Sequence, residues 1–113
     1  MSRDWRYVLK DIRVSCEKIG RFIEGLDYDA FVHDARTYDA VIRNLEIIGE
    51  ATRLARAELI SAAPEIEWRK IVELRNIVAH QYFGIDNQII WDVVTKRVPE
   101  LIGVLRRIER TLP

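Results

Sequence analysis

Apolar residues recur at steps of three and four along most of this chain, with charged residues between them. That spacing lines one face of an α-helix and differs from the strict alternation of a half-buried strand. The pattern predicts four helical stretches and no strand: about Asp4 to Glu24, Asp34 or Arg36 to Leu59, Glu67 to Gly84, and Asn87 to Thr111. The connectors between them are short, so neighbouring helices should run antiparallel. We therefore expect an all-α, antiparallel bundle of four to five helices.

Residues that begin and end helices stand where this pattern starts and stops. Asp4 and Asp86 can cap helix N-termini, and Gly25 and Gly84 can take the left-handed conformation that closes a helix. Proline removes a backbone donor and cannot sit in a regular helix interior. Pro99 therefore predicts a kink in the fourth stretch, or two consecutive helices.

The connector from Gly25 to His33 contains two carboxylates, Asp27 and Asp29, and has room for one short helical turn. Two aspartates raise the question of a metal site, but turns and helix caps use such residues far more often. We expect structural roles for both and no metal. His33 has no evident chemical partner, and we expect it to be solvated or to cap a helix.

The second stretch carries the segment RNLEIIGEA, in which Arg43, Glu46 and Glu50 form a charged stripe at helical spacing. We expect this stripe to be a solvated ladder of ion pairs. Gly49 lies within the same helix, where glycine costs about 1 kcal/mol relative to alanine. The cost predicts that another helix approaches closely at Gly49, either within the bundle or across a dimer.

Length, charge and cysteine content limit the possible functions. The 113 residues make one domain, 1–113, and eighteen basic residues balance eighteen acidic ones. Nucleic acid would therefore have to bind a local basic patch. Arg106, Arg107 and Arg110 form a basic helix end, but the helix dipole favours positive charge there, so these residues are no evidence for a nucleic-acid site. The single cysteine, Cys16, falls on an apolar stripe, which predicts a buried, inert thiol. We found no leader-like segment and no membrane-length apolar run, so we expect a cytoplasmic protein with no membrane contact.

The third stretch ends in a cluster of residues suited to a phosphodiester: Arg75, Asn76, His80 and Tyr82. Arginine binds phosphate oxygens with a permanent charge, and histidine exchanges protons near neutral pH. At about 100° per residue, Arg75 and Tyr82 share one helix face, whereas Arg75 and His80 lie about 140° apart. Either the helix loosens near His80, or two protomers combine their residues around a symmetry axis.

RNA cleavage is chemistry that such residues can perform without a metal or cofactor, because RNA carries its own nucleophile in the 2′-hydroxyl. His80 would act as base or acid, Arg75 would neutralise charge developing at phosphorus, and Tyr82 would stack on a base or orient the phosphate. The same residues also suit a helix end without catalysis. Histidine interacts favourably with a helix C-terminus, and tyrosine can bury its ring while its hydroxyl stays in water.

The motif Arg75-x4-His80-x-Tyr82 resembles that of HEPN-domain ribonucleases. More narrowly, the chain resembles the HepT toxins of HepT/MntA toxin–antitoxin systems over nearly its full length, through the segments RNLEIIGEA, PEIEWRKIVELRNIVAHQYFGID and IIWDVVTKRVPEL. This resemblance implies an all-α homodimer that cleaves RNA without metal at a composite site in the dimer cleft. It implies that Arg75 and His80 are catalytic and that Asn76 assists.

The resemblance also implies a regulator and a partner. Tyr82 matches the tyrosine that an MntA-like nucleotidyltransferase antitoxin modifies with AMP, which would silence the toxin of a type II system. The resemblance assigns no catalytic role to Glu46 or Glu50. The alternative is a helical protein that binds a nucleotidyltransferase or a nucleotide and does not cleave RNA.

Overall fold

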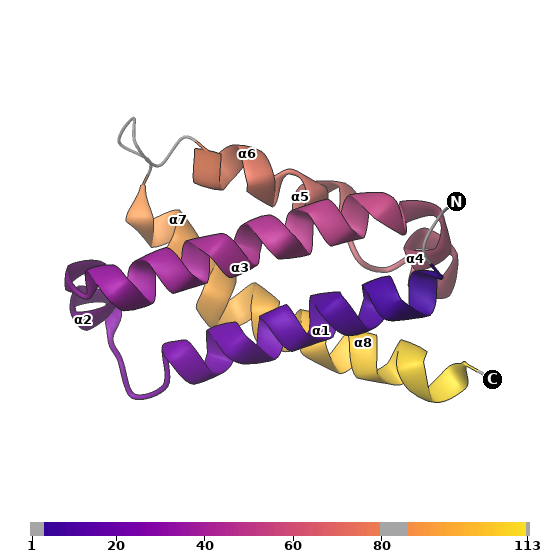
Figure 1. Cartoon of the computed structure of the whole chain (residues 1–113), viewed down its shortest axis with the longest axis horizontal. Coiled ribbons are helices and arrows are strands. Elements are labelled where there is room, and N and C mark those ends of the chain that lie inside the picture. The colour runs from indigo at the N-terminus through magenta and orange to yellow at the C-terminus, as the bar shows by residue number, and fades with distance from the viewer. Residues whose placement is uncertain (1–3, 80–85, 113) are drawn as a thin grey trace.

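The computed structural model of the chain describes residues 4–79 and 86–112, and every regular element in these ranges is helical (Figure 1). The elements are α1 (Trp5–Phe22), α2 (Tyr28–His33), α3 (Ala35–Leu54), α4 (Arg56–Ala62), α5 (Trp68–Val72), α6 (Leu74–Ala79), α7 (Asn87–Asp92), the π-helical turn η2 (Val93–Arg97) and α8 (Val98–Thr111). The predicted all-α class is confirmed.

The long helices α1 and α3 run antiparallel along the molecule, with α8 beside α1 and the α5–α6 pair lying along α3 (Figure 1). Their apolar stripes meet in one core. Among its fully buried members are Leu9, Ile12, Ile19, Phe31, Leu45, Ile48, Leu59, Trp68, Val78, Ile90 and Leu105. The pattern of three- and four-residue steps thus marks the buried faces correctly.

Local capping determines where several helices begin and end. The side chain of Asp4 accepts a hydrogen bond from the Arg6 N–H, and Asp86 accepts one from the Gln88 N–H, as predicted. Gly25 has φ +78°, a conformation that ordinary side chains disfavour, and it follows the end of α1. The proposed stop at Gly84 lies outside the described residues.

The connector after Gly25 contains the short helix α2, and its polar residues have the structural roles that we expected. Asp27 caps α2 by accepting from the Ala30 N–H at 2.8 Å. His33 Nδ1 lies 2.8 Å from the carbonyl oxygen of Asp29 in the last turn. Within the described part of the chain, no three His, Cys, Asp or Glu side chains come together as a metal site.

The prediction of one continuous second helix to Leu59 was wrong. The helix breaks at Ala55, which has φ −115°, and α4 continues across the end of the bundle. No glycine or proline causes the break. Instead α4 buries Leu59, and Ala63 after it is also buried, accepting a hydrogen bond from the indole N–H of buried Trp68 at 2.8 Å. Packing at the bundle end thus overrides the local preference for helix.

The third stretch is also divided, which the sequence pattern did not predict. α5 ends at Val72, Glu73 caps it, and α6 begins at Leu74. This junction lies directly over Gly49 of α3. A β-carbon on Gly49 would lie 3.3 Å from the Arg75 backbone nitrogen and 3.4 Å from the carbonyl oxygens of Ile71 and Val72. The predicted close approach at Gly49 is confirmed, and it occurs within the bundle.

The fourth stretch is interrupted before Pro99, as expected, and the interruption is a π-helical turn. The Val98 N–H donates to the carbonyl of Val93, five residues back, and the Thr95 hydroxyl donates to the carbonyl of Trp91. The wider turn accommodates a proline that cannot donate to the carbonyl four residues before it. α8 then continues to Thr111.

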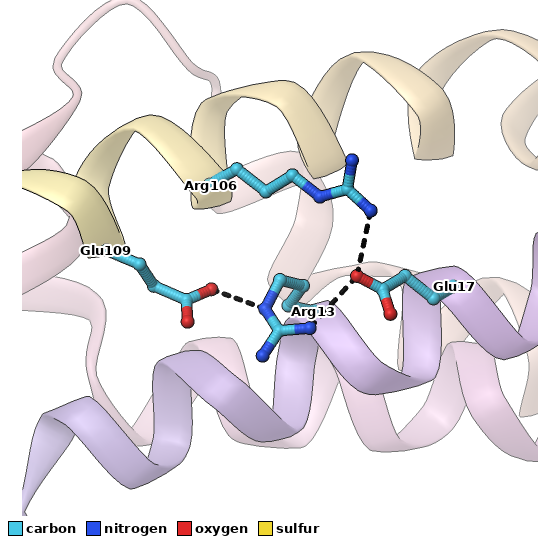
Figure 2. A network of polar contacts seen from close by, with 4 residues as sticks. All are labelled: Arg13, Glu17, Arg106 and Glu109. Atoms are coloured by element: carbon cyan, nitrogen blue, oxygen red, sulfur yellow. Dashed lines mark hydrogen bonds and ion pairs between the residues drawn. The ribbon is translucent and has the colours of Figure 1, made fainter.

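Ion pairs between helices use the basic end of α8. Arg13 donates to Glu109 at 2.6 Å and to Glu17 at 3.0 Å, and Arg106 donates to the same Glu17 oxygen at 3.2 Å (Figure 2). Arg107 pairs with Glu65. Two of the three arginines of this end therefore have structural partners. Across the residues that the structure describes, no helix is long and apolar enough to cross a membrane.

Candidate active site around Arg75

Arg75 is in the first turn of α6, and its side chain faces solvent. Two thirds (67%) of the side-chain surface is exposed, and Nη1 lies 3.3 Å from Glu50 Oε2 on α3. Toward the part of the chain that the structure describes, this contact uses one of the five guanidinium N–H groups. The exposed cation is the chemical feature that an RNA phosphate would need.

The Arg75 backbone is much more constrained than its side chain. The turn from Ile71 to Arg75 packs against the bare backbone of Gly49, and Leu74 and Val78 on the same helix are buried. The packed backbone fixes where the Arg75 side chain starts, while the exposed side chain keeps its own rotamer freedom. Gly49 thus sets how far Arg75 stands from α3.

Glu50 is shared by two arginines, and the closer one is Arg53. Arg53 Nη2 lies 2.5 Å from Glu50 Oε1, and its Nε lies 3.2 Å from Oε2. These hydrogen bonds from Arg53 are the main cause that lowers the pKa of Glu50, and the charge of Arg75 lowers it further. The carboxylate is therefore ionised at neutral pH and lies between two cations.

The predicted charged ladder on α3 is thus made of different residues. Glu50 pairs with Arg53, three residues further along the same helix, and with Arg75 from α6. Sequence reasoning missed Arg53 as the partner of Glu50, although its three-residue spacing from Glu50 was a usable signal.

An open groove of about 420 Å³ adjoins Arg75. It is lined by residues of α1, α3 and α6: Val8, Asp11, Glu46, Ile47, Glu50, Ala51, Leu54 and Arg75. The structure therefore brings Glu46, Glu50 and Arg75 to one surface. A second groove of about 450 Å³, between α5–α6 and η2–α8, is lined mainly by apolar side chains and does not include Arg75.

The other predicted site residues are only partly described. Asn76 follows Arg75 on α6, and it is exposed. His80 and Tyr82 lie outside the described residues, so the predicted angular separation of Arg75 and His80 stays a prediction. The described part of the motif ends at Ala79, the last residue of α6.

Comparison with known proteins decides the family. Residues 12–108 match the family model described as Ribonuclease HepT-like, which covers most of the chain. The chain belongs to the HepT-like ribonuclease family. The resemblance inferred from its sequence motifs, and with it the ribonuclease class, is confirmed.

Relatives of similar length support this membership of the HepT-like family. A Methanocaldococcus jannaschii protein provisionally named an RNase is 38% identical over 106 residues, covering 94% of this chain and 88% of the relative. A Thermococcus cleftensis protein named a probable ribonuclease HepT is 34% identical over 110 residues, covering 97% of this chain and all of the relative. No solved structure matches the chain.

Proposed function

We propose that this HepT-like protein is a metal-independent endoribonuclease in which Arg75 and His80 act on one phosphodiester. The observation that carries the proposal is the state of Arg75. Its side chain is 67% exposed and lies 3.3 Å from Glu50, while its backbone packs against Gly49. A structural arginine would normally spend more of its donors within the protein.

The reaction needs three contributions, and RNA supplies the nucleophile. A neutral His80 imidazole takes the proton of the 2′-hydroxyl, whose oxygen attacks phosphorus. The bond from phosphorus to the 5′-oxygen breaks, and that oxygen takes the proton back from the His80 imidazolium. Arg75 stabilises the extra negative charge on the phosphoryl oxygens in the transition state. The products are a 2′,3′-cyclic phosphate and a 5′-hydroxyl.

A homodimer would supply the missing alignment. On a regular helix about 140° would separate Arg75 from His80, so one chain would present them on different faces. A two-fold axis beside the motif would bring Arg75 of one protomer to His80 of the other, with Asn76 helping to position the phosphate. The proposal therefore joins the catalytic pair across the dimer cleft.

The biological role follows as a further part of the proposal. The protein acts as the toxin of a type II toxin–antitoxin pair. An MntA-like nucleotidyltransferase antitoxin transfers AMP from ATP to the hydroxyl oxygen of Tyr82, and pyrophosphate leaves. The added phosphate would occupy the positive charge that Arg75 offers to RNA. Modification would thus block the substrate site directly.

Analysis of product ends tests this function against a purely binding role. Purified protein is incubated with a 5′-labelled RNA oligonucleotide and with the matching DNA. The proposal predicts RNA fragments that end in 2′,3′-cyclic phosphate, and intact DNA. RNA that is bound but left intact would favour the non-catalytic helical partner instead, and 3′-hydroxyl ends would exclude attack by the 2′-oxygen.

A further inference from the structure

We propose that Arg53 is a positioning residue, which holds the Glu50 carboxylate so that Glu50 does not neutralise Arg75. This inference rests on the proposed role of Arg75 in binding the RNA phosphate. It assigns a function to a residue outside the Arg-x4-His-x-Tyr motif.

The geometry around Glu50 is unequal. Arg53 binds both carboxylate oxygens, at 2.5 Å and 3.2 Å, whereas Arg75 approaches one oxygen at 3.3 Å. A carboxylate can accept a bidentate pair from only one guanidinium in its own plane. Arg53 fills that place, and among the described residues Arg75 makes one contact with Glu50, at 3.3 Å.

Removal of Arg53 would change this balance. Glu50 would keep its negative charge, and Arg75 would be the remaining cation of the pair. Arg75 and Glu50 could then form the close, bidentate ion pair that Arg53 and Glu50 form now. An incoming phosphate would have to displace a carboxylate from Arg75 and would also approach a like charge, both of which weaken phosphate binding.

Loss of the ion pair between Arg53 and Glu50 should leave the fold intact. The side chains of Glu50, Arg53 and Arg75 are 41%, 55% and 67% exposed. Exposed ion pairs contribute little to stability because water screens them. The effect of Arg53 should therefore appear in RNA cleavage rather than in unfolding.

A competing explanation is that Arg53 contacts RNA itself. The two explanations differ when Glu50 is also changed. If Arg53 restrains Glu50, the loss of Arg53 lowers RNA cleavage only while residue 50 carries a negative charge. If Arg53 binds a phosphate of the RNA, the loss of Arg53 lowers RNA cleavage whatever residue is at position 50.

The test compares the effect of Arg53→Ala in the presence of Glu50 and in the Glu50→Gln background. We expect kcat/KM for RNA cleavage to fall about tenfold in the first case, which is less than the roughly hundredfold that a 1 Å misplacement can cost, and less than about twofold in the second. Arg69→Ala is the matched control, because Arg69 forms a similar exposed pair with Glu73 at 3.4 Å on α5. It should leave kcat/KM unchanged.

A binding measurement gives a readout that a structural role would not change. The probe is a 2′-O-methyl RNA oligonucleotide, which cannot be cleaved. In the Glu50→Gln background, Arg53→Ala should not alter the slope of log affinity against log salt. A slope reduced by about 0.7, the contribution of one phosphate contact to a single strand, would overturn the proposal.

The outcomes also separate this inference from the proposed function. An equal loss of cleavage on Arg53→Ala in both backgrounds would overturn the positioning role alone. A wild-type protein that does not cleave RNA would overturn the proposed function, and the cleavage comparison would then have no signal in any variant.

Discussion

Gly49 and Arg75 touch through their backbones: a β-carbon on Gly49 would lie 3.3 Å from the Arg75 nitrogen. The contact links the helix that carries Glu50 and Arg53 to the helix that begins the ribonuclease motif. Because α5 and α6 pack mainly on α3, this contact also fixes the separation between the two helices. The position of Arg75 therefore depends on the absence of a side chain at Gly49, twenty-six residues earlier in the sequence.

Gly49→Val should displace the start of α6 and move Arg75. The contacts at Gly49 are backbone atoms, which cannot rotate away, so we expect a loss of about 1–3 kcal/mol in the free energy of unfolding. RNA cleavage should fall together with stability. Urea denaturation and initial cleavage rates measure the two effects.

The matched control is Gly20→Val on α1, where a β-carbon would have nothing within 4 Å. Valine is no worse than glycine in an exposed helix, so stability should change by less than about 0.5 kcal/mol. If Gly49→Val were as stable and as active as Gly20→Val, Gly49 would not set the position of Arg75.

Mixing two inactive variants tests whether the site is shared between protomers. Arg75→Ala and His80→Ala should each lower the cleavage rate by at least about a hundredfold. If Arg75 and His80 join across a dimer, a 1:1 mixture after subunit exchange regains about a quarter of wild-type activity, since half the dimers hold one complete site. A mixture as inactive as its components would locate both residues of a site in one chain.

Tyr82→Phe should abolish transfer of AMP from ATP while leaving RNA cleavage largely intact. Phenylalanine keeps the ring but removes the hydroxyl that would be modified. Incubation with a cognate nucleotidyltransferase and labelled ATP, followed by gel analysis, measures the transfer. Tyr38→Phe is a suitable control, because the Tyr38 hydroxyl is already engaged with Asn87 at 2.6 Å. Label remaining on Tyr82→Phe would place the modification elsewhere.

The buried thiol of Cys16 should make the folded protein less stable at alkaline pH. Burial raises the pKa of the Cys16 thiol from its ordinary 9.0 to about 12. The native thiol thus stays protonated where the unfolded thiol ionises, so its stabilising effect is complete below pH 9 and is lost progressively from there to about pH 12.

Urea unfolding at pH 8 and pH 10 measures this effect. Between these pH values the wild type should lose about 1.4 kcal/mol more stability than Cys16→Ala, which has no thiol to titrate. The difference isolates Cys16 from the lysines and tyrosines that titrate in both proteins. Equal losses would show that Cys16 ionises without cost in the fold.

Features controlled by nearby residues were predictable from the sequence. The caps at Asp4 and Asp86 depend on hydrogen bonds within two residues, and the interruption before Pro99 follows from one missing N–H. The breaks at Ala55 and Glu73 were not predictable, because good helix formers surround them and distant packing causes them.

The site shows the same division. The motif could be read from residues 75 to 82, where its chemistry stays a prediction, and Gly49 correctly indicated a close helix approach. The pairing of Glu50 with Arg75 could not be read, because it joins residues twenty-five apart in the sequence that meet only in the fold. The role of Arg53 depends in turn on that pairing.

The central claim is that the Arg75–His80 pair cleaves RNA without a metal. The most direct measurement is cleavage of a labelled RNA by the purified protein in excess EDTA, compared with His80→Ala whose fold and oligomeric state are checked by circular dichroism and gel filtration. We predict that the wild type cleaves at the same rate with and without EDTA, and that His80→Ala is slower by about 10²–10⁴-fold while it remains folded. Full activity of His80→Ala, or loss of wild-type activity in EDTA, would contradict the claim.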